Sequence, residues 1–189
     1  MAHEGQRIPA VTFKMRERTD EIGQPNPYVW VDKTTADLFQ NKRVAVFSLP
    51  GAFTPTCTSK QLPEFENVFY AQLITVAIDA VYCISVNDAF VMKQWADKLK
   101  VEKIQMIPDG NGLFTKGMNM LVKKENLGFG NRSWRYSMVV DNMVIQKMWV
   151  EPGKMDNAED DPYTITQPNY MYEWCKQQYE KDGGKSLYM

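Results

Sequence analysis

The sequence contains a single histidine, His3, close to its first residue. Cys-His and Ser-His-Asp catalytic sites, two-histidine zinc sites and H-E-x-x-H helices all need a histidine in the ordered part of a fold. We expect the start of the chain to be frayed, so His3 supplies none of these arrangements. A nucleophile in this protein is therefore expected to be activated without a histidine base.

The chain also lacks an excess of charge of either sign. Its 22 basic and 23 acidic residues give a net charge of -1, without a broad basic field for nucleic acid or anionic lipid. The first residues, "MAHEGQRIPAVTF", lack the features of a secretory signal peptide, and no apolar run has the length that spans a bilayer. We therefore expect a cytoplasmic protein that binds neither nucleic acid nor membranes.

Cysteine is scarce as well, with three residues, Cys57, Cys83 and Cys175, at irregular spacing. An odd number without a regular pattern is typical of a reducing compartment, not of a disulfide framework, and leaves at least one thiol free. Because "TSK" follows Cys57, the chain has no C-x-x-C there. Dithiol-disulfide exchange of the thioredoxin kind is therefore not expected.

Apolar runs and segments of helical periodicity alternate along the chain. The run 43–49 is apolar almost throughout, as expected of a strand that is covered on both faces and central in its sheet. Strands followed by helices, then a hairpin and a last helix, predict an α/β, thioredoxin-like fold with a central mixed sheet flanked by helices. We expect a single domain over residues 1–189, with a flexible end from about residue 182. The predicted strands are 43–49, 81–86, 104–107, 135–140 and 143–150, with Asp141 and Asn142 as the hairpin loop, and the predicted helices run from 57 into the low seventies, over 88–99 and over 169–181.

Two residues predict details of these helices. Pro63 lies inside the first predicted helix, where its missing N–H is expected to kink the helix or make its start irregular. Asp88 precedes the second predicted helix and is expected to cap its first turn.

Cys57 follows the strand 43–49 by one tight loop and stands at the start of a predicted helix. Unpaired N–H groups and the helix dipole stabilise a thiolate there, so the sulfur can act as a nucleophile without a histidine. The alternative is a small buried apolar residue, as cysteine often is. The loop "PGAFTPT" favours the reactive thiol, because such strand-loop-helix junctions are where α/β sheets place their ligands.

The remaining thiols and two arginines are further candidates. Cys83, in the middle of "VYCISV", is interpreted as a core residue, whereas Cys175 is either a helix-packing residue or an exposed thiol. Arg135 starts the predicted strand 135–140 and can project a guanidinium toward a thiolate or an oxyanion, and Arg132 in the preceding loop is a second candidate. The pattern alone is equally compatible with two surface charges.

The run "PGAFTPTC" matches the peroxiredoxin signature of Pro, three residues, Thr, two residues and Cys, at Pro50, Thr54 and Cys57. The segments "SVNDAFVMKQW", "PDGNGLFTKGMNMLVKKENLGFGNRSWRYSMVV" and "VEPG" extend the match. Over roughly residues 8–175 the chain resembles the type II, or peroxiredoxin-5-like, branch of that family. The resemblance includes the peroxiredoxin part of bacterial peroxiredoxin-glutaredoxin hybrids.

This resemblance implies a thiol peroxidase that reduces hydrogen peroxide and organic hydroperoxides without a cofactor or a metal. It makes Cys57 the peroxidatic cysteine and Thr54 the residue that hydrogen-bonds the thiolate and the incoming peroxide. It also implies that Pro50 shields the pocket from water and that Arg135 polarises sulfur and peroxide. Attack on an O–O bond needs an ionised sulfur, a guiding donor and positive charge for the leaving oxygen. The product is a sulfenic acid at Cys57.

The sequence departs from the family in two ways. Animal members of the branch carry a resolving cysteine shortly before the last helix, where "DPYTITQPN" has none and Ile165 takes the equivalent place. The sequence also lacks the glutaredoxin part of the hybrids. We therefore expect a one-cysteine cycle in which glutathione, glutaredoxin, thioredoxin or another external thiol reduces the sulfenic acid.

The resemblance also bears on partners. The family commonly dimerises through loops around the active site, so a homodimer is expected. Phe53, Phe90 and Trp95 belong either to such a surface or to the core. The alternative function is a peroxide sensor or redox relay that passes oxidation from Cys57 to other proteins by direct contact.

Overall fold

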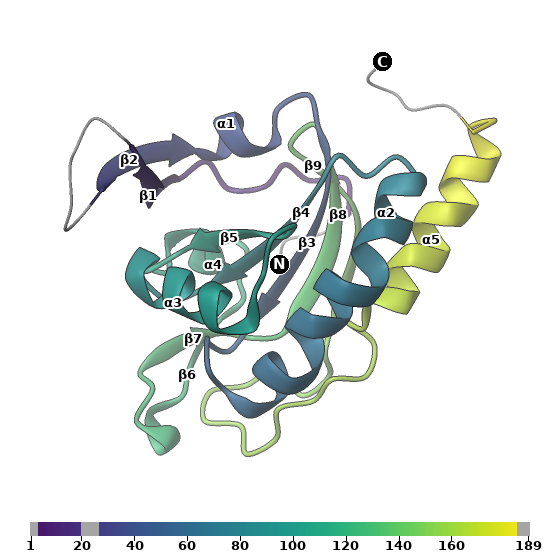
Figure 1. Cartoon of the computed structure of the whole chain (residues 1–189). Helices are drawn as coiled ribbons and strands as arrows, with labels where there is room; N and C mark the ends of the chain where they lie inside the picture. The colour runs from purple at the N-terminus through teal and green to yellow at the C-terminus, as the bar shows by residue number, and fades with distance from the viewer. Residues whose placement is uncertain (1–3, 20–26, 185–189) are drawn as a thin grey trace.

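The computed structural model describes residues 4–19 and 27–184, so His3 and the end of the chain from residue 185 lie outside the described residues. The central sheet consists of β3 Arg43–Leu49, β4 Ala80–Ser85, β5 Gln105–Pro108, β8 Tyr136–Asp141 and β9 Val144–Val150. Their order is β5-β4-β3-β8-β9, and helices cover both faces (Figure 1). β3, β4 and β5 run parallel, whereas β8 is antiparallel to β3 and to β9. The predicted mixed sheet flanked by helices is confirmed, with β3 in the central position.

Smaller elements complete the fold, and some of them are absent from the sequence-based expectation. Two antiparallel pairs that the sequence pattern does not predict are β1 Thr12–Arg18 with β2 Tyr28–Thr34, and β6 Leu121–Lys123 with β7 Asn131–Ser133. The helices are α1 Thr35–Phe39, α2 Tyr70–Thr75, α3 Ala89–Leu99, α4 Leu113–Gly117, α5 Pro168–Lys181 and the 3-10 turn η3 Glu125–Leu127. The expected cap of α3 is confirmed, since the Asp88 carboxylate accepts hydrogen bonds from two N–H groups of the first turn. In the part of the chain that the structure describes, no helix has the length and apolarity to cross a membrane.

The two faces of the sheet carry separate apolar cores, and the alternation along β3 divides its side chains between them. Val44 and Val46 face the core beneath α1, α4 and β1. Ala45, Phe47 and Leu49 face the core beneath α2, α3 and α5. All five side chains are fully buried. Because β3 is fixed from both sides, the loop that follows it starts from a rigid point.

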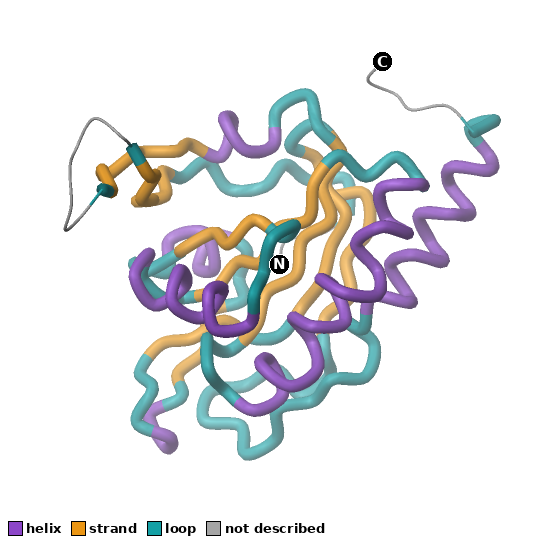
Figure 2. Tube along the Cα trace, viewed as in Figure 1, coloured by secondary structure: helices purple, strands orange, loops and turns teal. Residues whose placement is uncertain are grey.

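One helical segment runs from residue 55 to residue 75 and ends as α2 (Figure 2). Two of its stretches are π-helical, η1 Cys57–Gln61 and η2 Glu64–Phe69. They flank Pro63, whose missing N–H interrupts ordinary helical hydrogen bonding. Within the first stretch, the carbonyl oxygen of Cys57 accepts a hydrogen bond from the N–H five residues on. The irregularity predicted at Pro63 is confirmed, and Cys57 lies within it.

The hairpin between β8 and β9 differs from the prediction by one residue. Its loop is Asn142 and Met143 instead of Asp141 and Asn142, because Asp141 still pairs with Arg43 of β3. Asn142 and Met143 have φ of 43° and 74°, the positive values that a tight two-residue hairpin turn requires. Met143 is buried in the core beneath α1. Burial of this side chain sets the position of the turn, which the residue types do not reveal.

The link between α2 and β4 consists of residues 76–79. Val76 and Ile78 in this link are buried in the core beneath α2 and α5. Asp79 accepts a hydrogen bond from the Arg43 N–H at 2.7 Å, which ties the link to the start of β3. The link therefore contributes to packing at the end of the sheet where β3 and β4 begin.

Candidate active site

Cys57 lies where the sequence places it, behind a tight loop that leads from β3 into the long helical segment. Pro50, at the start of the loop, is buried, and Cys57 has no exposed surface. Asn87 holds the loop, since its Oδ1 accepts hydrogen bonds from the Ala52 N–H at 2.9 Å and from the Ser85 hydroxyl at 2.7 Å. The loop is thereby tied to the end of the neighbouring strand β4.

Arg135 reaches the sulfur, as the sequence predicts. Its Nη1 lies 3.5 Å from Cys57 Sγ and also donates to Gln61 Oε1. Its Nη2 pairs with the Asp161 carboxylate, and its Nε donates to the Pro162 carbonyl oxygen at 2.9 Å. Arg135 is 1% exposed. All three nitrogens of the guanidinium are thus held in place, one of them against the thiol.

The charge of Arg135 is secured by its surroundings. Burial disfavours the cation, but the facing Cys57 and the carboxylate of Asp161 outweigh it, so the pKa of Arg135 is raised. The Tyr163 ring lies over the guanidinium, with its centroid 5.5 Å from Cζ. The Tyr163 hydroxyl donates to Glu64 Oε2 at 2.5 Å, which fixes the ring. The sulfur therefore faces a permanent, immobile positive charge.

The other two thiols are unsuited to attack. Cys83 lies in β4 and Cys175 in α5, and both are fully buried. Burial raises the pKa of Cys83 well above its ordinary value and that of Cys175 to about 12. Both thiols therefore stay protonated at neutral pH. Cys83 is confirmed as a core residue, and Cys175 is a helix-packing residue instead of an exposed thiol.

Thr54 departs from its expected role. Its hydroxyl donates a hydrogen bond to the Gly51 carbonyl oxygen at 2.7 Å, within the loop before Cys57. A hydroxyl has one proton to donate, so the hydrogen bond expected from Thr54 to the sulfur is not made in this geometry. Rotation of the hydroxyl is needed before Thr54 can donate to a thiolate or to a bound ligand.

A cavity of about 220 Å³ lies on the outer side of the Cys57 loop. Its walls are mostly apolar, and Pro50 and Thr54 form part of them. Asp161, the ion-pair partner of Arg135, contributes to the same walls. The complete lining is Pro50, Thr54, Pro55, Thr56, Lys124, Leu127, Phe129, Glu159 and Asp161. This cavity borders the loop that carries Cys57, and its apolar lining suits a ligand with an alkyl or aryl group.

Glu151 anchors the segment that supplies the partners of Arg135. Its carboxylate accepts five hydrogen bonds, from the N–H and hydroxyl groups of Thr164 and Thr166 and from the Ile165 N–H, at 2.6 to 3.0 Å. The Glu151 N–H in turn donates to the Arg135 carbonyl oxygen at 3.2 Å. One buried carboxylate therefore fixes the chain on both sides of the guanidinium.

Replacing Glu151 with glutamine is expected to lower the free energy of unfolding at pH 7 by about 1 to 3 kcal/mol, because an amide leaves several of these donors unsatisfied. Burial raises the pKa of Glu151, but the hydrogen bonds from Thr164 and Thr166 outweigh it, so its pKa is lowered on folding. The carboxylate therefore stabilises the fold fully above its ordinary pKa of about 4.3 and loses that effect as the pH falls through the lowered value.

Urea unfolding of wild type and Glu151→Gln at pH 7 and at pH 3 measures this difference. The gap between the two proteins should shrink at the lower pH. Glu173, an exposed residue of α5, provides a matched control, and Glu173→Gln should change stability by less than about 0.5 kcal/mol. A gap that is the same at both pH values would contradict the role of the ionised carboxylate.

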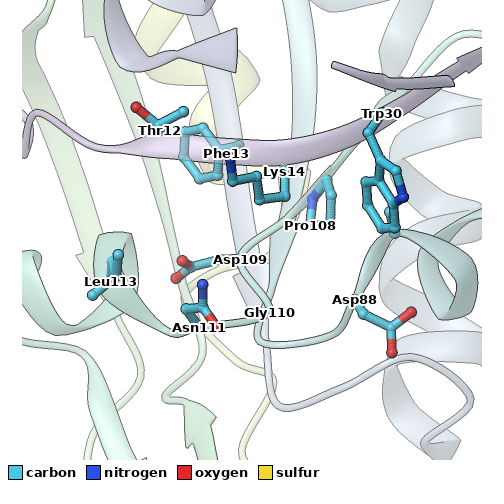
Figure 3. A pocket seen from close by; sticks show the side chains of 11 residues that line it. Thr12, Phe13, Lys14, Trp30, Asp88, Pro108, Asp109, Gly110, Asn111 and Leu113 are labelled. Carbon is cyan, nitrogen blue, oxygen red and sulfur yellow. The ribbon is translucent and has the colours of Figure 1, made fainter. Parts of the chain in front are cut away.

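Another cavity, of about 250 Å³, lies between β1, β2 and the loop after β5 (Figure 3). Its acidic side chains are engaged in capping: Asp109 accepts from the Phe114 and Thr115 N–H groups, and Asp88 caps α3. None of its lining residues is a thiol or belongs to the Cys57 loop. Across the described ranges, no three His, Cys, Asp or Glu side chains are placed to hold a metal ion. The site with nucleophilic chemistry is therefore the one at Cys57.

Known proteins resemble this chain over a region that includes the site. Residues 3–163 match the Redoxin family. The peroxiredoxin y4vD of Sinorhizobium fredii is 54% identical over 167 residues, which cover 88% of this chain and 88% of that protein. The hybrid peroxiredoxin hyPrx5 of Haemophilus influenzae is 45% identical over 185 residues, which cover 98% of this chain and 71% of that protein.

The fold agrees with the same group of proteins. The crystal structure of the Plasmodium falciparum antioxidant protein, described as a 1-Cys peroxiredoxin, superposes with a TM-score of 0.83 at 40% identity. The superposition covers 92% of this chain and 99% of that one. Residues 3–163, which match the Redoxin family, include the loop from Pro50 to Cys57 and the strand that follows Arg135.

Proposed function

Because this chain belongs to the peroxiredoxin family, in its type II or peroxiredoxin-5-like branch, we propose that an external thiol completes its catalytic cycle. Membership makes the chain a thiol peroxidase, an oxidoreductase that needs no prosthetic cofactor. The proposal adds a one-cysteine cycle on hydrogen peroxide and organic hydroperoxides. Its reductant is glutathione, glutaredoxin, thioredoxin or another external thiol.

The observation that carries this proposal is the placement of the three thiols. Cys57 faces Arg135 beside a cavity, whereas Cys83 and Cys175 are fully buried in a strand and in a helix interface. The segment that Glu151 anchors includes Ile165, which by the resemblance is equivalent to the resolving cysteine of animal members of the branch. Neither buried thiol is available to close a disulfide without disrupting the core, which favours a reductant from outside.

The first step follows from the geometry around the sulfur. The Cys57 thiolate attacks one peroxide oxygen, an S–O bond forms, and the O–O bond breaks. Sulfur is oxidised by two electrons, and the leaving oxygen takes a proton and departs as water or an alcohol. Arg135, at 3.5 Å from the sulfur, stabilises both the thiolate and the developing oxyanion. Cys57 is left as a sulfenic acid.

The second step needs a thiol to reach a buried sulfur. The incoming thiol forms an S–S bond with Cys57 and releases the sulfenic oxygen as water; a second thiol then exchanges with the mixed disulfide and restores Cys57. Since Cys57 has no exposed surface, any ligand requires movement of the loop or of η1, and a thiol requires a larger movement than hydrogen peroxide does. The π-helical bonding of η1 makes this stretch the natural place for such movement.

Oxidation of the reduced protein by one equivalent of hydrogen peroxide in the presence of glutathione tests the cycle. We expect intact mass and peptide mapping to find a glutathione mixed disulfide on Cys57 alone. A disulfide from Cys57 to Cys83 or Cys175 would overturn the one-cysteine cycle. Slow turnover with every small thiol, together with stable disulfides to particular proteins, would favour the sensor or relay function.

Thr54 provides a prediction about the peroxide step. Thr54→Val removes the hydroxyl and is expected to slow oxidation of Cys57 by about 10²-fold, the usual cost of losing one donor to a developing oxyanion. Thr54→Ser keeps the hydroxyl and should stay within about threefold of wild type. Stopped-flow tryptophan fluorescence measures both rates. Equal rates for Thr54→Val and wild type would show that the Gly51 hydrogen bond is the whole role of this hydroxyl.

A homodimer and a cytoplasmic location are part of the proposal. Phe53 in the Cys57 loop and Phe90 in α3 are about half exposed, which supports an apolar contact surface near the site. Trp95 is fully buried and donates to the Thr58 hydroxyl at 3.1 Å, so it belongs to the core. Three free buried thiols are compatible with a reducing compartment. A monomer in sedimentation equilibrium would contradict the dimer.

A further inference from the structure

Arg132 stands at the rim of the Cys57 site, between the cavity wall and the loop. It belongs to β7, where it pairs with Val122 of β6. Its Cζ lies 5.7 Å from the centroid of the Phe129 ring, which lines the cavity outside Cys57. On its other side, a Cβ added to Gly51 would lie 3.6 Å from Arg132 Nε. The guanidinium therefore borders both the cavity and the loop that carries the reactive thiol.

The cations around this cavity differ in their partners. Arg135 pairs with Asp161. Lys124 is buried and donates to the Ala158 carbonyl oxygen at 2.8 Å. Arg132 donates to the neighbouring Asn131 carbonyl oxygen at 2.9 Å, and no carboxylate among the described residues forms an ion pair with it.

Arg132 is thus a half-buried cation without an acidic partner. Burial lowers its pKa, which shows that the surroundings disfavour its charge. A guanidinium presents several donors in a planar fork that fits a carboxylate, and only one of them has a protein acceptor here. An anionic ligand at the rim would supply the missing acceptor and offset the cost of burying the charge.

We propose that Arg132 binds a carboxylate of the thiol reductant and so directs a glutathione-like thiol to the oxidised Cys57. This inference rests on the proposed one-cysteine cycle. The carboxylate makes no covalent change: the thiol of the same molecule forms the S–S bond with Cys57, and the sulfenic oxygen leaves as water.

The positive charge of Arg132 favours an anionic reductant over a neutral peroxide as its ligand. Hydrogen peroxide and simple alkyl hydroperoxides carry no carboxylate, and Arg135 already faces the sulfur where their oxygens react. Glutathione carries two carboxylates, and because Cys57 has no exposed surface, glutathione contacts residues around the site, such as the half-buried Arg132, before it reaches the sulfur. A cation at the rim therefore acts on the second half of the cycle.

The test separates the two halves. Cys57 is first oxidised by one equivalent of hydrogen peroxide, and the loss of the sulfenic acid is then followed with glutathione, glutathione diethyl ester or 2-mercaptoethanol. Arg132→Gln is expected to slow the reaction with glutathione about tenfold, the effect of losing a charge-assisted hydrogen bond. The reactions with the ester, with 2-mercaptoethanol and with hydrogen peroxide should not change.

Two controls sharpen the result. Arg132→Lys keeps the charge and should recover part of the glutathione rate. Lys60→Gln removes an exposed cation one helical turn after Cys57 and should leave the rate unchanged. On wild-type protein alone, the diethyl ester should react about tenfold more slowly than glutathione, so the proposal is testable even if Arg132→Gln fails to fold.

Other outcomes overturn the proposal. Equal slowing with all three thiols would mean that Arg132 only supports the loop. Unchanged glutathione kinetics, with slower oxidation by a carboxylate-bearing hydroperoxide, would assign Arg132 to the peroxide instead. Failure of hydrogen peroxide to oxidise Cys57 would remove the peroxidase itself, and this first step is read out before any thiol is added.

Discussion

Cys57→Ser is expected to abolish peroxidase turnover, with a loss of more than about 10³-fold. Serine oxygen is not ionised at neutral pH and cannot form the sulfenic acid that stores the oxidising equivalents. The variant should fold, because the change is one atom in a side chain that the core already encloses. Peroxide consumption in the presence of a thiol reductant measures the effect.

The matched controls are Cys83→Ala and Cys175→Ala, which remove the other thiols and keep those positions apolar. Because both thiols are buried and protonated at neutral pH, we expect each variant to retain turnover close to that of wild type. Some loss of stability from the small cavity is expected in both. Substantial turnover by Cys57→Ser would exclude Cys57 as the nucleophile.

Arg135→Met is expected to slow the oxidation of Cys57 by hydrogen peroxide by about 10²- to 10³-fold. The substitution keeps much of the side-chain volume but removes the charge that faces both the thiolate and the leaving oxygen. It also leaves the Asp161 carboxylate and the Gln61 amide oxygen without their donor. The second-order rate constant from stopped-flow fluorescence reports the loss.

Arg135→Lys and Asp161→Asn separate charge from geometry. Lysine keeps the charge without the planar fork, so its rate should lie between those of Arg135→Met and wild type. Asp161→Asn leaves the guanidinium charged and still bonded to Pro162, so its loss should be less than about tenfold. A rate for Arg135→Met within threefold of wild type, in a variant whose thermal unfolding is normal, would exclude Arg135 from the chemistry.

The sequence predicts those parts of the site that depend on local order along the chain. The apolar run 43–49, the Pro-Gly loop and the helical periodicity after it place Cys57 at a strand-loop-helix junction, and Pro63 predicts the irregular helix. The lone His3 excludes a histidine base from composition alone. The first two inferences need no knowledge of tertiary contacts, and the structure confirms them, whereas His3 lies outside the described residues and its exclusion stays a prediction from composition.

The partners of Arg135 depend on contacts between distant residues, and the sequence pattern does not contain them. Gln61 and Asp161 lie 74 and 26 residues from Arg135 along the chain, and nothing distinguishes Asp161 from its acidic neighbours. Gln61 offered one signal, since it stands four residues after Cys57 and shares its helix face. The anchoring role of Glu151 is equally hidden until the strand and the segment after it are brought together.

The sequence pattern does not predict the antiparallel pair of β1 and β2, for a different reason. β1 and β2 are largely exposed, so their sequences contain many polar residues and no continuous apolar run. Phe13 is the side chain of β1 that enters the core fully. A strand pair that lies over the edge of a domain has a weak period-2 signal, and pattern analysis is least informative there.

Stopped-flow oxidation of the reduced protein by one equivalent of hydrogen peroxide, followed by intact mass and peptide mapping, tests the central role of Cys57 most directly. We predict a reaction far faster than that of a free thiol, with one oxygen atom added at Cys57 and no internal disulfide. A rate no faster than that of free cysteine, or oxygen found on Cys83 or Cys175 instead, would contradict the assignment of Cys57 as the peroxidatic residue.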